Sequence, residues 1–322
     1  MSRGHWAGGV WVAMVTPWHR RRGILEEAID ALIERFVAAG VSGLFILGTT
    51  GEGTLLSPEE RMAFAEAVVA RSRGRLPVIV HAGHDIPRLA AELARHARDT
   101  GAVAVAVAPP TRYRLEGEEL FSHYAYLADV VGDYPLLLYD IPSTTRNPLG
   151  GALLARLHDS HANVVGAKVS RSDWEGWRGY LAVAEGLAVF VGNDEMIYPL
   201  LLMGAAGLVS GLANLFPSLY VELYSASVRG DLPRAREIQR LVWRLCDVCH
   251  GASPLAYVKR GLEILGVPAG EPLPPLRDLS QDEIRELERN LREVQRAEAG
   301  IMAKGGENRS ESFFSKPTTQ RR

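Results

Sequence analysis

The chain has 322 residues, of which 47% are hydrophobic and 23% charged, and its 36 basic and 38 acidic side chains give a formal net charge of −2. This composition excludes disorder of the whole chain and predicts one large domain or two smaller ones with a substantial apolar core. The charge balance argues against a nucleic-acid or anionic-membrane surface, which needs clustered, uncompensated Lys and Arg. Small-molecule chemistry is the expected class of function.

The cysteine content and the N-terminal residues predict a cytoplasmic protein. Cys246 and Cys249 are the only cysteines, too few for a secreted disulfide scaffold. Residues 1–5 lead into no apolar stretch long enough for a signal peptide. Residues 197–216 are almost uniformly apolar, but Gly204 and Gly207 divide them into a short helix and a short strand. We therefore expect no membrane span.

Apolar runs of strand length alternate along the chain with longer amphipathic stretches of helical spacing. The expected strands are 10–15, 43–47, 77–81, 103–108, 135–139, 164–168, 188–191 and 207–210. The expected helices are 26–39, 58–73, 87–100, 117–131, 149–158, 173–184, 194–203 and 216–229. Ser57 before Pro58 and two acids is typical of a helix start. The alternation predicts successive βα units.

Strands that are apolar on both faces belong to a parallel sheet covered by helices, and about eight repeats fit a closed α/β barrel, the (β/α)8 or TIM barrel. We assign this barrel to residues 1–230. An open doubly wound sheet is the alternative, disfavoured because no dinucleotide fingerprint follows the first strands. Helices are then expected over 232–249, 254–265 and 281–299, which form a C-terminal helical extension over residues 231–299. Residues 300–322 are polar and aperiodic, which predicts a disordered tail.

In such a barrel the site lies at the C-terminal ends of the strands. Lys168 closes the apolar run 163–167. Burial disfavours the ammonium form of a lysine and makes its amine available for attack on a carbonyl. A lysine that snorkels to solvent or pairs with a carboxylate is the alternative.

Two further features fall at strand ends. Tyr139 ends an apolar strand, where its phenol is suited to general acid/base chemistry, although a core tyrosine with a satisfied hydroxyl is the alternative. Residues 48–53 form a Gly-spaced, hydroxyl-rich loop suited to presenting N–H groups and two Thr hydroxyls to an anion. The loop lacks the Lys of a phosphate-binding P-loop, which favours a carboxylate as its guest.

In motif order, residues 8–266 resemble the dihydrodipicolinate synthase and N-acetylneuraminate lyase superfamily of pyruvate-handling class I aldolases. The motifs that carry the resemblance are Gly48-Thr49-Thr50-Gly51-Glu52, Tyr139-Asp140-Ile141-Pro142, Gly166-Ala167-Lys168 and Gly192-Asn193-Asp194-Glu195. The resemblance implies a homotetramer that needs neither a metal ion nor an organic cofactor, with pyruvate and an aldehyde as its small-molecule partners.

The resemblance also implies roles for individual residues. Lys168 would form a Schiff base with a 2-oxo acid, while Tyr139 moves protons with Thr49 in its hydroxyl relay. Thr50 and the loop N–H groups, including those of Gly48 and Gly51, would hold the substrate carboxylate. Two pocket-lining positions follow at the ends of later strands, namely Gly192 and Val209.

This sequence departs from the family pattern at three points, one of which is Val169 where an acid often follows the lysine. Where the synthases have an Arg for the second substrate's carboxylate, this chain has Thr144, with Arg146 two residues later. Where many members have a Tyr pair that reaches a neighbouring subunit, this chain has Arg112 followed by Tyr113. The departure at Thr144 disfavours the lysine-biosynthetic reaction, and the departure at Arg112 alters the proton path or transfers it to Tyr113.

Two motifs have competing interpretations. Asn193, Asp194 and Glu195, which follow Gly192, resemble the polyol-recognising stretch of sugar-acid aldolases. The same three residues are equally typical of a capped helix start. Residues 246–250 match the c-type haem attachment pattern, which we disfavour because the chain shows no export signal.

The sequence therefore predicts a Schiff-base aldolase or lyase acting on a pyruvate-derived 2-oxo acid, with a 2-keto-3-deoxy sugar acid or sialic-acid-like substrate. Dihydrodipicolinate synthase or a keto-acid dehydratase of the same family is the alternative within this chemistry. A non-catalytic 2-oxo-acid-binding protein is the alternative from another class.

Overall fold

The computed structural model describes residues 6–249 and 254–312. Eight parallel strands close into a barrel in the order β1, β10, β9, β8, β7, β6, β5, β4. They are β1 (Gly9–Ala13), β4 (Gly43–Ile46), β5 (Val78–His81), β6 (Ala104–Val107), β7 (Leu136–Asp140), β8 (Val164–Val169), β9 (Ala188–Val191) and β10 (Gly207–Ser210). The closed parallel barrel predicted from the repeat count is thus confirmed.

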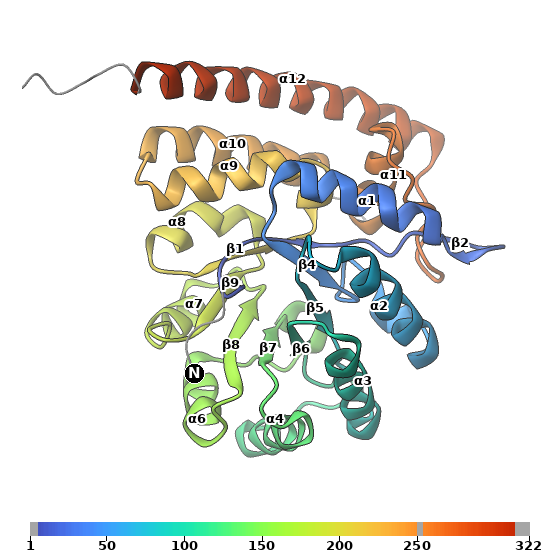
Figure 1. Ribbon diagram of the computed structural model, residues 1–322, viewed down its shortest axis with the longest axis vertical. Helices are drawn as coiled ribbons and strands as arrows, with labels where there is room; N and C mark the ends of the chain where they lie inside the picture. The colour runs from blue at the N-terminus through green and yellow to red at the C-terminus, as the bar shows by residue number, and fades with distance from the viewer. Residues whose placement is uncertain (1–5, 250–253, 313–322) are drawn as a thin grey trace, which may run out of the picture.

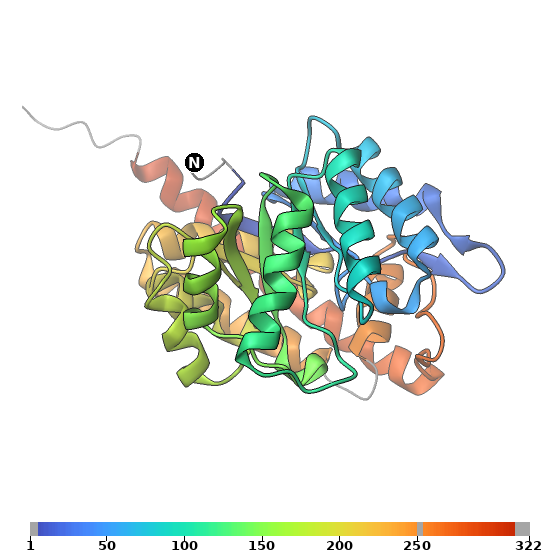
Figure 2. The same cartoon turned by 90° about the horizontal axis from the view of Figure 1, so that it is seen from below.

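Helices between the strands surround the barrel (Figures 1 and 2). They are α1 (Glu26–Ala39), α2 (Pro58–Ser72), α3 (Pro87–Thr100), α4 (Gly117–Val131), α6 (Gly151–Ser160), α7 (Trp174–Leu181), α8 (Ile197–Leu202) and α9 (Pro217–Val228). The predicted start of α2 is present as a reciprocal cap between Ser57 and Glu60, which satisfies N–H groups that the first turn leaves free.

Alternating strand residues build two separate apolar cores. Val10 and Val12 of β1 face outward into the larger core between sheet and helices. Trp11, between them, faces into the barrel, where its ring meets Phe190 edge to face at 6.3 Å between centroids. Val209 belongs to the same interior cluster. The barrel is therefore a packed core with no central pore, and reactive side chains are confined to its ends.

The C-terminal helices form an outer layer on one side of the barrel (Figure 1). They are α10 (Leu232–Val248), α11 (Pro254–Ile264) and α12 (Gln281–Ser312). Helix α10 packs on α9, and α12 packs on α10 and α11. Helix α12 continues past the predicted end at residue 299 because Ile301 is buried and its carbonyl accepts from Arg234. Residues 300–312 are thus helical, while 313–322 lie outside the described residues.

Three local features differ from the prediction. A small hairpin of β2 (Trp18–His19) and β3 (Gly23–Ile24) and a short helix α5 (Pro142–Thr145) were not expected. The single helix expected over 194–203 is divided into a 3₁₀ turn, Asp194–Met196, and α8. Pro199 explains the division, because it has no N–H to donate back to residue 195.

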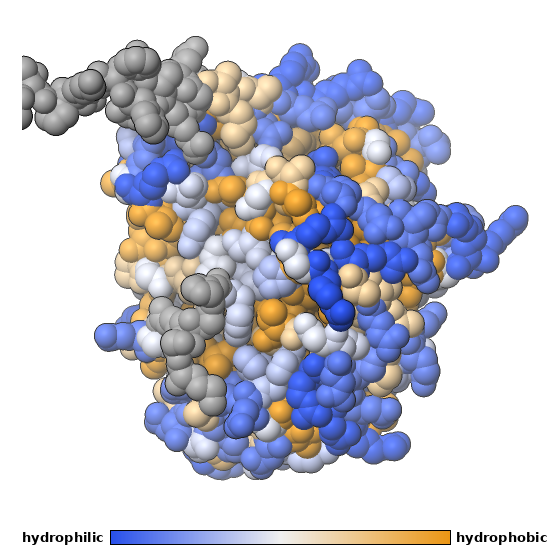
Figure 3. Space-filling view, in the orientation of Figure 1, coloured by the Kyte–Doolittle hydropathy of each residue, from blue (hydrophilic) through white to orange (hydrophobic). Residues whose placement is uncertain are grey.

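The molecular surface fits the mixed composition. On the face drawn in Figure 3, apolar side chains lie in separate patches among polar ones. Within residues 6–249 and 254–312, no helix combines the length and the apolar character that crossing a bilayer would require.

Candidate active site

Parallel pairing brings Tyr139 and Lys168 together. The two residues are register partners on β7 and β8, and Lys168 is in turn paired with Phe190 on β9. Lys168 is 4% exposed, and its Nζ lies 4.2 Å from the ring centroid of Phe45 and 4.2 Å from that of Tyr139. The amine therefore sits between two aromatic faces at the C-terminal end of the barrel.

Lys168 is not held as half of an ion pair. Among the described residues, no carboxylate oxygen lies within 4.0 Å of its Nζ, so the expected alternative of a carboxylate partner is not seen. Ring faces attract a cation more weakly than a buried carboxylate does. Gly192 leaves room for the lysine stem, since a Cβ there would lie 3.2 Å from Lys168 Cε and 2.2 Å from Ser170 Oγ. The lysine side chain is therefore confined, and no described carboxylate balances its charge.

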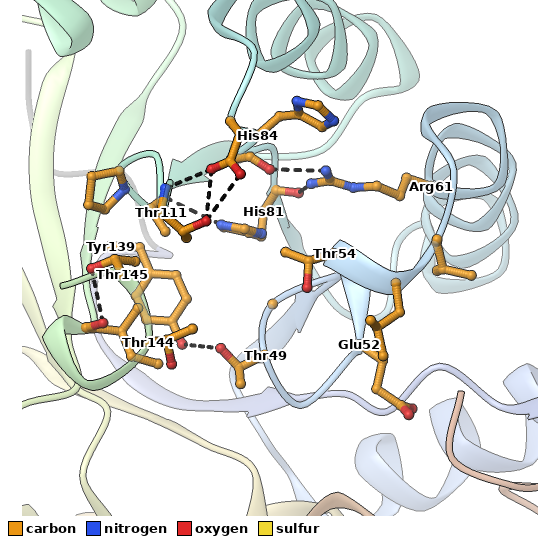
Figure 4. A pocket seen from close by; sticks show the side chains of 18 of the residues that line it. Thr49, Glu52, Thr54, Arg61, His81, His84, Thr111, Tyr139, Thr144 and Thr145 are labelled. Carbon is orange, nitrogen blue, oxygen red and sulfur yellow. Dashed lines mark hydrogen bonds between the residues drawn. The ribbon is translucent and has the colours of Figure 1, made fainter. Parts of the chain in front are cut away.

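The Tyr139 hydroxyl lies 3.2 Å from Thr49 Oγ1, and either group can donate (Figure 4). The Tyr139 ring is fixed by edge contacts with Phe45, at 5.6 Å, and with His81, at 5.5 Å. The structure thus brings together Lys168, Tyr139 and Thr49, the three residues predicted to be catalytic. Thr50 lies on the other side of the loop, where its Oγ1 would be 2.7 Å from a Cβ at Gly211.

The loop 48–53 is folded against the end of β4 so closely that its glycines are required. A Cβ at Gly51 would lie 2.8 Å from the Leu47 nitrogen, and one at Gly53 would lie 1.9 Å from the Leu47 oxygen. A Cβ at Gly48 would lie 2.7 Å from the Phe45 ring. The Gly51 carbonyl accepts from Thr16 Oγ1 at 2.6 Å. The loop therefore presents Thr49 and Thr50 from a fixed backbone.

His81 is a site residue that the sequence analysis missed. Its Nε2 accepts from the Ala108 N–H at 3.3 Å, which leaves Nδ1 to donate to the Leu47 carbonyl at 3.0 Å. Burial, and next the charge of Arg61, lowers the pKa of His81 to about 3. His81 is the last residue of β5, so the strand-end rule that singled out Lys168 would also have found it.

A cavity of about 360 Å³ opens beside Tyr139 on the side of β4 to β7 (Figure 4). Arg61 lies buried in its wall and donates to the carbonyls of His81, at 2.8 Å, and Gly83, at 3.0 Å. Its lining includes Gly48, Thr49, His81, Tyr139 and Thr144. We refer to it as the relay cavity, because it reaches the Thr49 and Tyr139 hydroxyls.

A second cavity, of about 470 Å³, lies on the side of β8 and β9 and is lined by Gly192. We refer to it as the polar cavity. Its lining includes Ser143, Ser170, Arg171, Asn193, Asp194 and Glu195. Asp194 accepts from the Ser210 hydroxyl. Burial raises the pKa of the Asp194 carboxyl, while Ser210, Tyr220 and the charge of Lys168 oppose that rise.

The three residues after Gly192 divide between the two interpretations of this motif, a helix cap and a ligand-binding stretch. Asn193 does cap the turn, since its Oδ1 accepts from the Glu195 N–H at 3.0 Å, while its Nδ2 donates to the Arg171 carbonyl at 3.1 Å. Asp194 makes no such cap and lines the polar cavity, as does Glu195, which is exposed. The same short stretch therefore contains a structural residue and two residues able to meet a ligand.

The segment after β6 carries Arg112 and Tyr113 at the surface. Tyr113 is 72% exposed and Arg112 is also exposed, and neither lines the relay or the polar cavity. The backbone is nevertheless held, because Asn147 Nδ2 donates to the Tyr113 carbonyl at 2.8 Å and Thr111 donates to Asp85. The chain by itself thus does not bring Arg112 or Tyr113 to Lys168.

The structure also shows where the predicted site residues of the loop after β7 lie. Thr144 is exposed and lines the relay cavity. Arg146 ends α5 in the left-handed conformation with φ 60°, is exposed, and is not among the described residues that line either cavity. Asp140, by contrast, is fully buried and accepts from Tyr180 and Arg171 at 2.9 and 3.3 Å. Its hydrogen bonds hold the end of β7 against the segment before α6 and against α7.

Cys246 and Cys249 are free thiols that line the polar cavity. Burial raises the pKa of Cys249 to about 12. His250, the third member of the haem-like pattern, lies outside the described residues. Within the part of the chain that the structure describes, no three His, Cys, Asp or Glu side chains are grouped so as to hold a metal ion.

The structure combines an eight-stranded barrel with a buried lysine and a pair of hydroxyls at the C-terminal end of its strands. This combination is typical of barrel enzymes that act on small carbonyl compounds through a lysine. Residues 7–294 match the model of the dihydrodipicolinate synthetase family, and the chain belongs to this family. It is accordingly a lyase of the class I aldolase type, in line with the predicted enzyme class.

Three known proteins show the range of the similarity. The 4-hydroxy-tetrahydrodipicolinate synthase of Methanopyrus kandleri is 33% identical over 300 residues, covering 92% of this chain and 98% of that protein. The N-acetylneuraminate lyase of Rhizobium meliloti is 31% identical, covering 87% and 92%. The structure of YagE from E. coli K12 in complex with pyruvate has a TM-score of 0.86 at 26% identity, covering 89% and 98%.

The lowered pKa of His81 predicts a pH dependence of stability. Between about pH 6 and about pH 4, the unfolded chain binds a proton at this residue and the folded chain does not, so the free energy of unfolding falls as the pH falls. In His81→Asn that fall should be shallower by about 1 kcal/mol per pH unit. Urea denaturation across this range measures it, and equal slopes in the two proteins would contradict a neutral, buried imidazole.

Proposed function

We propose that this protein catalyses reversible aldol cleavage of a hydroxylated 2-oxo acid through an imine between Lys168 and the C2 carbonyl. The observation that carries the proposal is the buried Lys168 amine, unpaired with any described carboxylate and 4.2 Å from the ring of a tyrosine that contacts Thr49. A buried amine of this kind is suited to nucleophilic attack on a carbonyl.

Imine formation requires protons to move at the carbonyl oxygen. The neutral Lys168 amine attacks C2, the oxygen of the resulting carbinolamine takes a proton, and water leaves to give the protonated imine. We assign this proton transfer to the Tyr139 hydroxyl, because the Tyr139 ring lies 4.2 Å from the amine and Thr49, at 3.2 Å from the hydroxyl, can give or receive its proton. The protonated nitrogen of the Lys168 imine polarises the bond to C2 and acts as the electron sink.

Cleavage follows from the same imine. A base removes the proton of the C4 hydroxyl, the C3–C4 bond breaks, and its electron pair passes into the iminium to form an enamine as the aldehyde leaves. Protonation of the enamine at C3 and hydrolysis of the imine release pyruvate and free Lys168. We assign the proton transfers at C3 and C4 to Tyr139, and its register pairing with Lys168 supports the assignment.

The carboxylate of the substrate is assigned to the loop 48–53. Thr50 presents its hydroxyl toward Gly211, and the N–H groups of Gly48 and Gly51 belong to a backbone fixed against Leu47. Backbone N–H groups and hydroxyls at a tight loop favour an anion. Gly192 and Val209 complete the walls near the reacting carbon, one by leaving space and the other from the barrel interior.

The polar cavity is assigned to the hydroxylated tail. Gly192, which lines it, also packs beside the Lys168 stem, and the cavity offers Asp194, Glu195, Ser143 and Ser170 as donors and acceptors for several hydroxyl groups. A cavity of this composition favours a 2-keto-3-deoxy sugar acid or a sialic-acid-like compound over a small apolar aldehyde. The lyase relative from Rhizobium meliloti supports the same substrate class.

A second candidate function is the condensation of pyruvate with aspartate semialdehyde. The synthase from Methanopyrus kandleri supports it, with 33% identity over 92% of this chain. Against it stands Thr144, which lines the relay cavity at the position where a cation would be expected, while Arg146 is turned out at the end of α5. A homotetramer, the state implied by family resemblance, would be needed for Arg112 or Tyr113 to reach a neighbouring site.

Borohydride reduction tests the imine. In the presence of pyruvate, the wild-type protein should gain the mass of one reduced pyruvate on the peptide that contains Lys168, because reduction locks the imine as a stable amine. Lys168→Met should gain none, and Arg260→Met, whose side chain pairs with Asp278 away from the loop 48–53, should gain the adduct as wild type does. Absence of the adduct in folded wild-type protein at saturating pyruvate would overturn the proposal.

Tyr139→Phe tests proton transfer. The change removes only the hydroxyl that contacts Thr49 and leaves the ring contacts with Phe45 and Lys168. We expect turnover to fall about 10²- to 10⁴-fold. Tyr126→Phe, at a 42% exposed surface position, should retain wild-type turnover. Coupling pyruvate release to a lactate dehydrogenase assay measures both, and near-normal turnover of Tyr139→Phe would contradict its assigned role.

A substrate panel separates the candidate functions. Sugar-acid cleavage should release pyruvate, whereas condensation with aspartate semialdehyde should be slower by about tenfold or more. Asp194→Asn should raise KM for the sugar acid about 10- to 100-fold, because a charged acceptor for hydroxyls is lost. Its half-saturation by pyruvate in borohydride trapping should stay unchanged. The reverse preference would favour the synthase, and binding of 2-oxo acids without turnover would favour the non-catalytic protein.

A further inference from the structure

Glu52 closes the Gly-Thr-Thr-Gly-Glu motif, yet its carboxylate takes no part in the proposed chemistry. Its backbone is left-handed, with φ 53°, between two glycines that pack on Leu47. Figure 4 shows its side chain directed away from Thr49 and Tyr139, toward the C-terminal part of the chain. The carboxylate therefore faces a different partner from the rest of the loop.

That partner is Lys259 on α11. Lys259 Nζ lies 2.5 Å from Glu52 Oε2, and both side chains are 0% exposed. The second oxygen, Glu52 Oε1, accepts from the Leu273 N–H at 2.7 Å. Lys259 Nζ also donates to the Glu271 carbonyl at 2.8 Å. One buried carboxylate thus joins the loop after β4 to α11 and to the segment that follows it.

The loop needs such a restraint. Leu47 and Glu52 both adopt the left-handed backbone region, with φ 61° and 53°, which side chains other than glycine occupy at a cost. Backbone of this kind persists only where its surroundings hold it. The Glu52 N–H donates to the Thr49 carbonyl at 3.0 Å, so a shift of residue 52 is passed directly to Thr49.

We propose that Glu52 and Lys259 are positioning residues, through which the C-terminal helical extension holds Thr49 and Thr50 in their working geometry. Glu52 is among the residues that line the relay cavity, but the side chains of the pair are 0% exposed, so the pair acts on the substrate loop through its backbone. The expected effect of the pair on pyruvate trapping rests on the proposed function, whereas its expected effect on the loop backbone does not. The extension is in this respect a part of the site.

The chain offers a matched control one residue away. Arg260, next to Lys259 on α11, pairs with Asp278, and its Nε lies 2.8 Å from Asp278 Oδ1. That pair joins α11 to the stretch before α12 and does not contact the loop 48–53. Both pairs anchor the same C-terminal segment, so a difference between them reports on the loop and not on general stability.

The experiment compares K259M, the double variant E52Q/K259M and R260M with wild type. Hydrogen exchange of the backbone amides over residues 47–56 is followed by mass spectrometry. In K259M we expect exchange of this peptide to rise about tenfold or more, while peptides of β7 and β8 stay protected. In R260M the loop peptide should match wild type. The double variant, which leaves no uncompensated carboxylate, keeps the test decisive if K259M folds poorly.

Borohydride trapping with pyruvate provides the second measurement. We expect the half-saturating pyruvate concentration to rise about ten- to a hundredfold in K259M and E52Q/K259M, with a maximal trapping rate close to wild type. R260M should show neither change. A failure of wild type to form the adduct would remove the imine mechanism and leave the exchange result to decide this inference.

Two outcomes would overturn the proposal. Loop exchange in E52Q/K259M that matches wild type would show that the pair does not restrain the loop. An equal rise in R260M and K259M, in exchange or in half-saturation, would assign the pair to overall stability alone.

Discussion

Tyr139 and Lys168 are paired in register on adjacent parallel strands, and the rest of the site is arranged around that pairing. Closure of the barrel fixes the register, because each strand is bonded on both sides and cannot slip without turning its inward side chains outward. Phe45 and His81, from the ends of β4 and β5, then hold the Tyr139 ring. The hydroxyl that meets Thr49 is positioned by packing in the barrel before any substrate arrives.

Two buried lysines in this chain illustrate how surroundings decide reactivity. Lys259 is fully enclosed and its charge is neutralised by Glu52, so its amine is bound in a structural pair. Lys168 is almost as buried but lies between the rings of Phe45 and Tyr139, with no described carboxylate within reach. Burial alone does not make a nucleophile. An amine that is buried and left without a carboxylate is the one suited to attack a carbonyl.

The relay cavity and the polar cavity are lined by different parts of this end of the barrel. Thr49 and Tyr139 line the relay cavity, whereas the polar cavity is lined by Asp194 and by Gly192, which also packs beside the Lys168 stem. Under the proposed function, proton transfer and recognition of the hydroxylated tail would therefore take place in different cavities. Such a division would allow the proposed imine chemistry to be kept while changes in the side chains of the polar cavity alter the preferred aldehyde.

The alternation of apolar runs with amphipathic stretches was enough to predict the eight strands, the barrel and the placement of Lys168, Tyr139 and Thr49 at its C-terminal end. These are local or periodic properties, and parallel topology brings strand ends together without further information. The division of 194–203 was not predicted although Pro199 signals it, whereas the helical continuation to Ser312 depends on the burial of Ile301, which the sequence does not show. Asn193 as a cap, Asp194 as a cavity residue, the neutral His81 and the Glu52 to Lys259 pair were decided only by tertiary structure. Each depends on which distant groups lie within a few ångströms, and one sequence contains no measure of that distance.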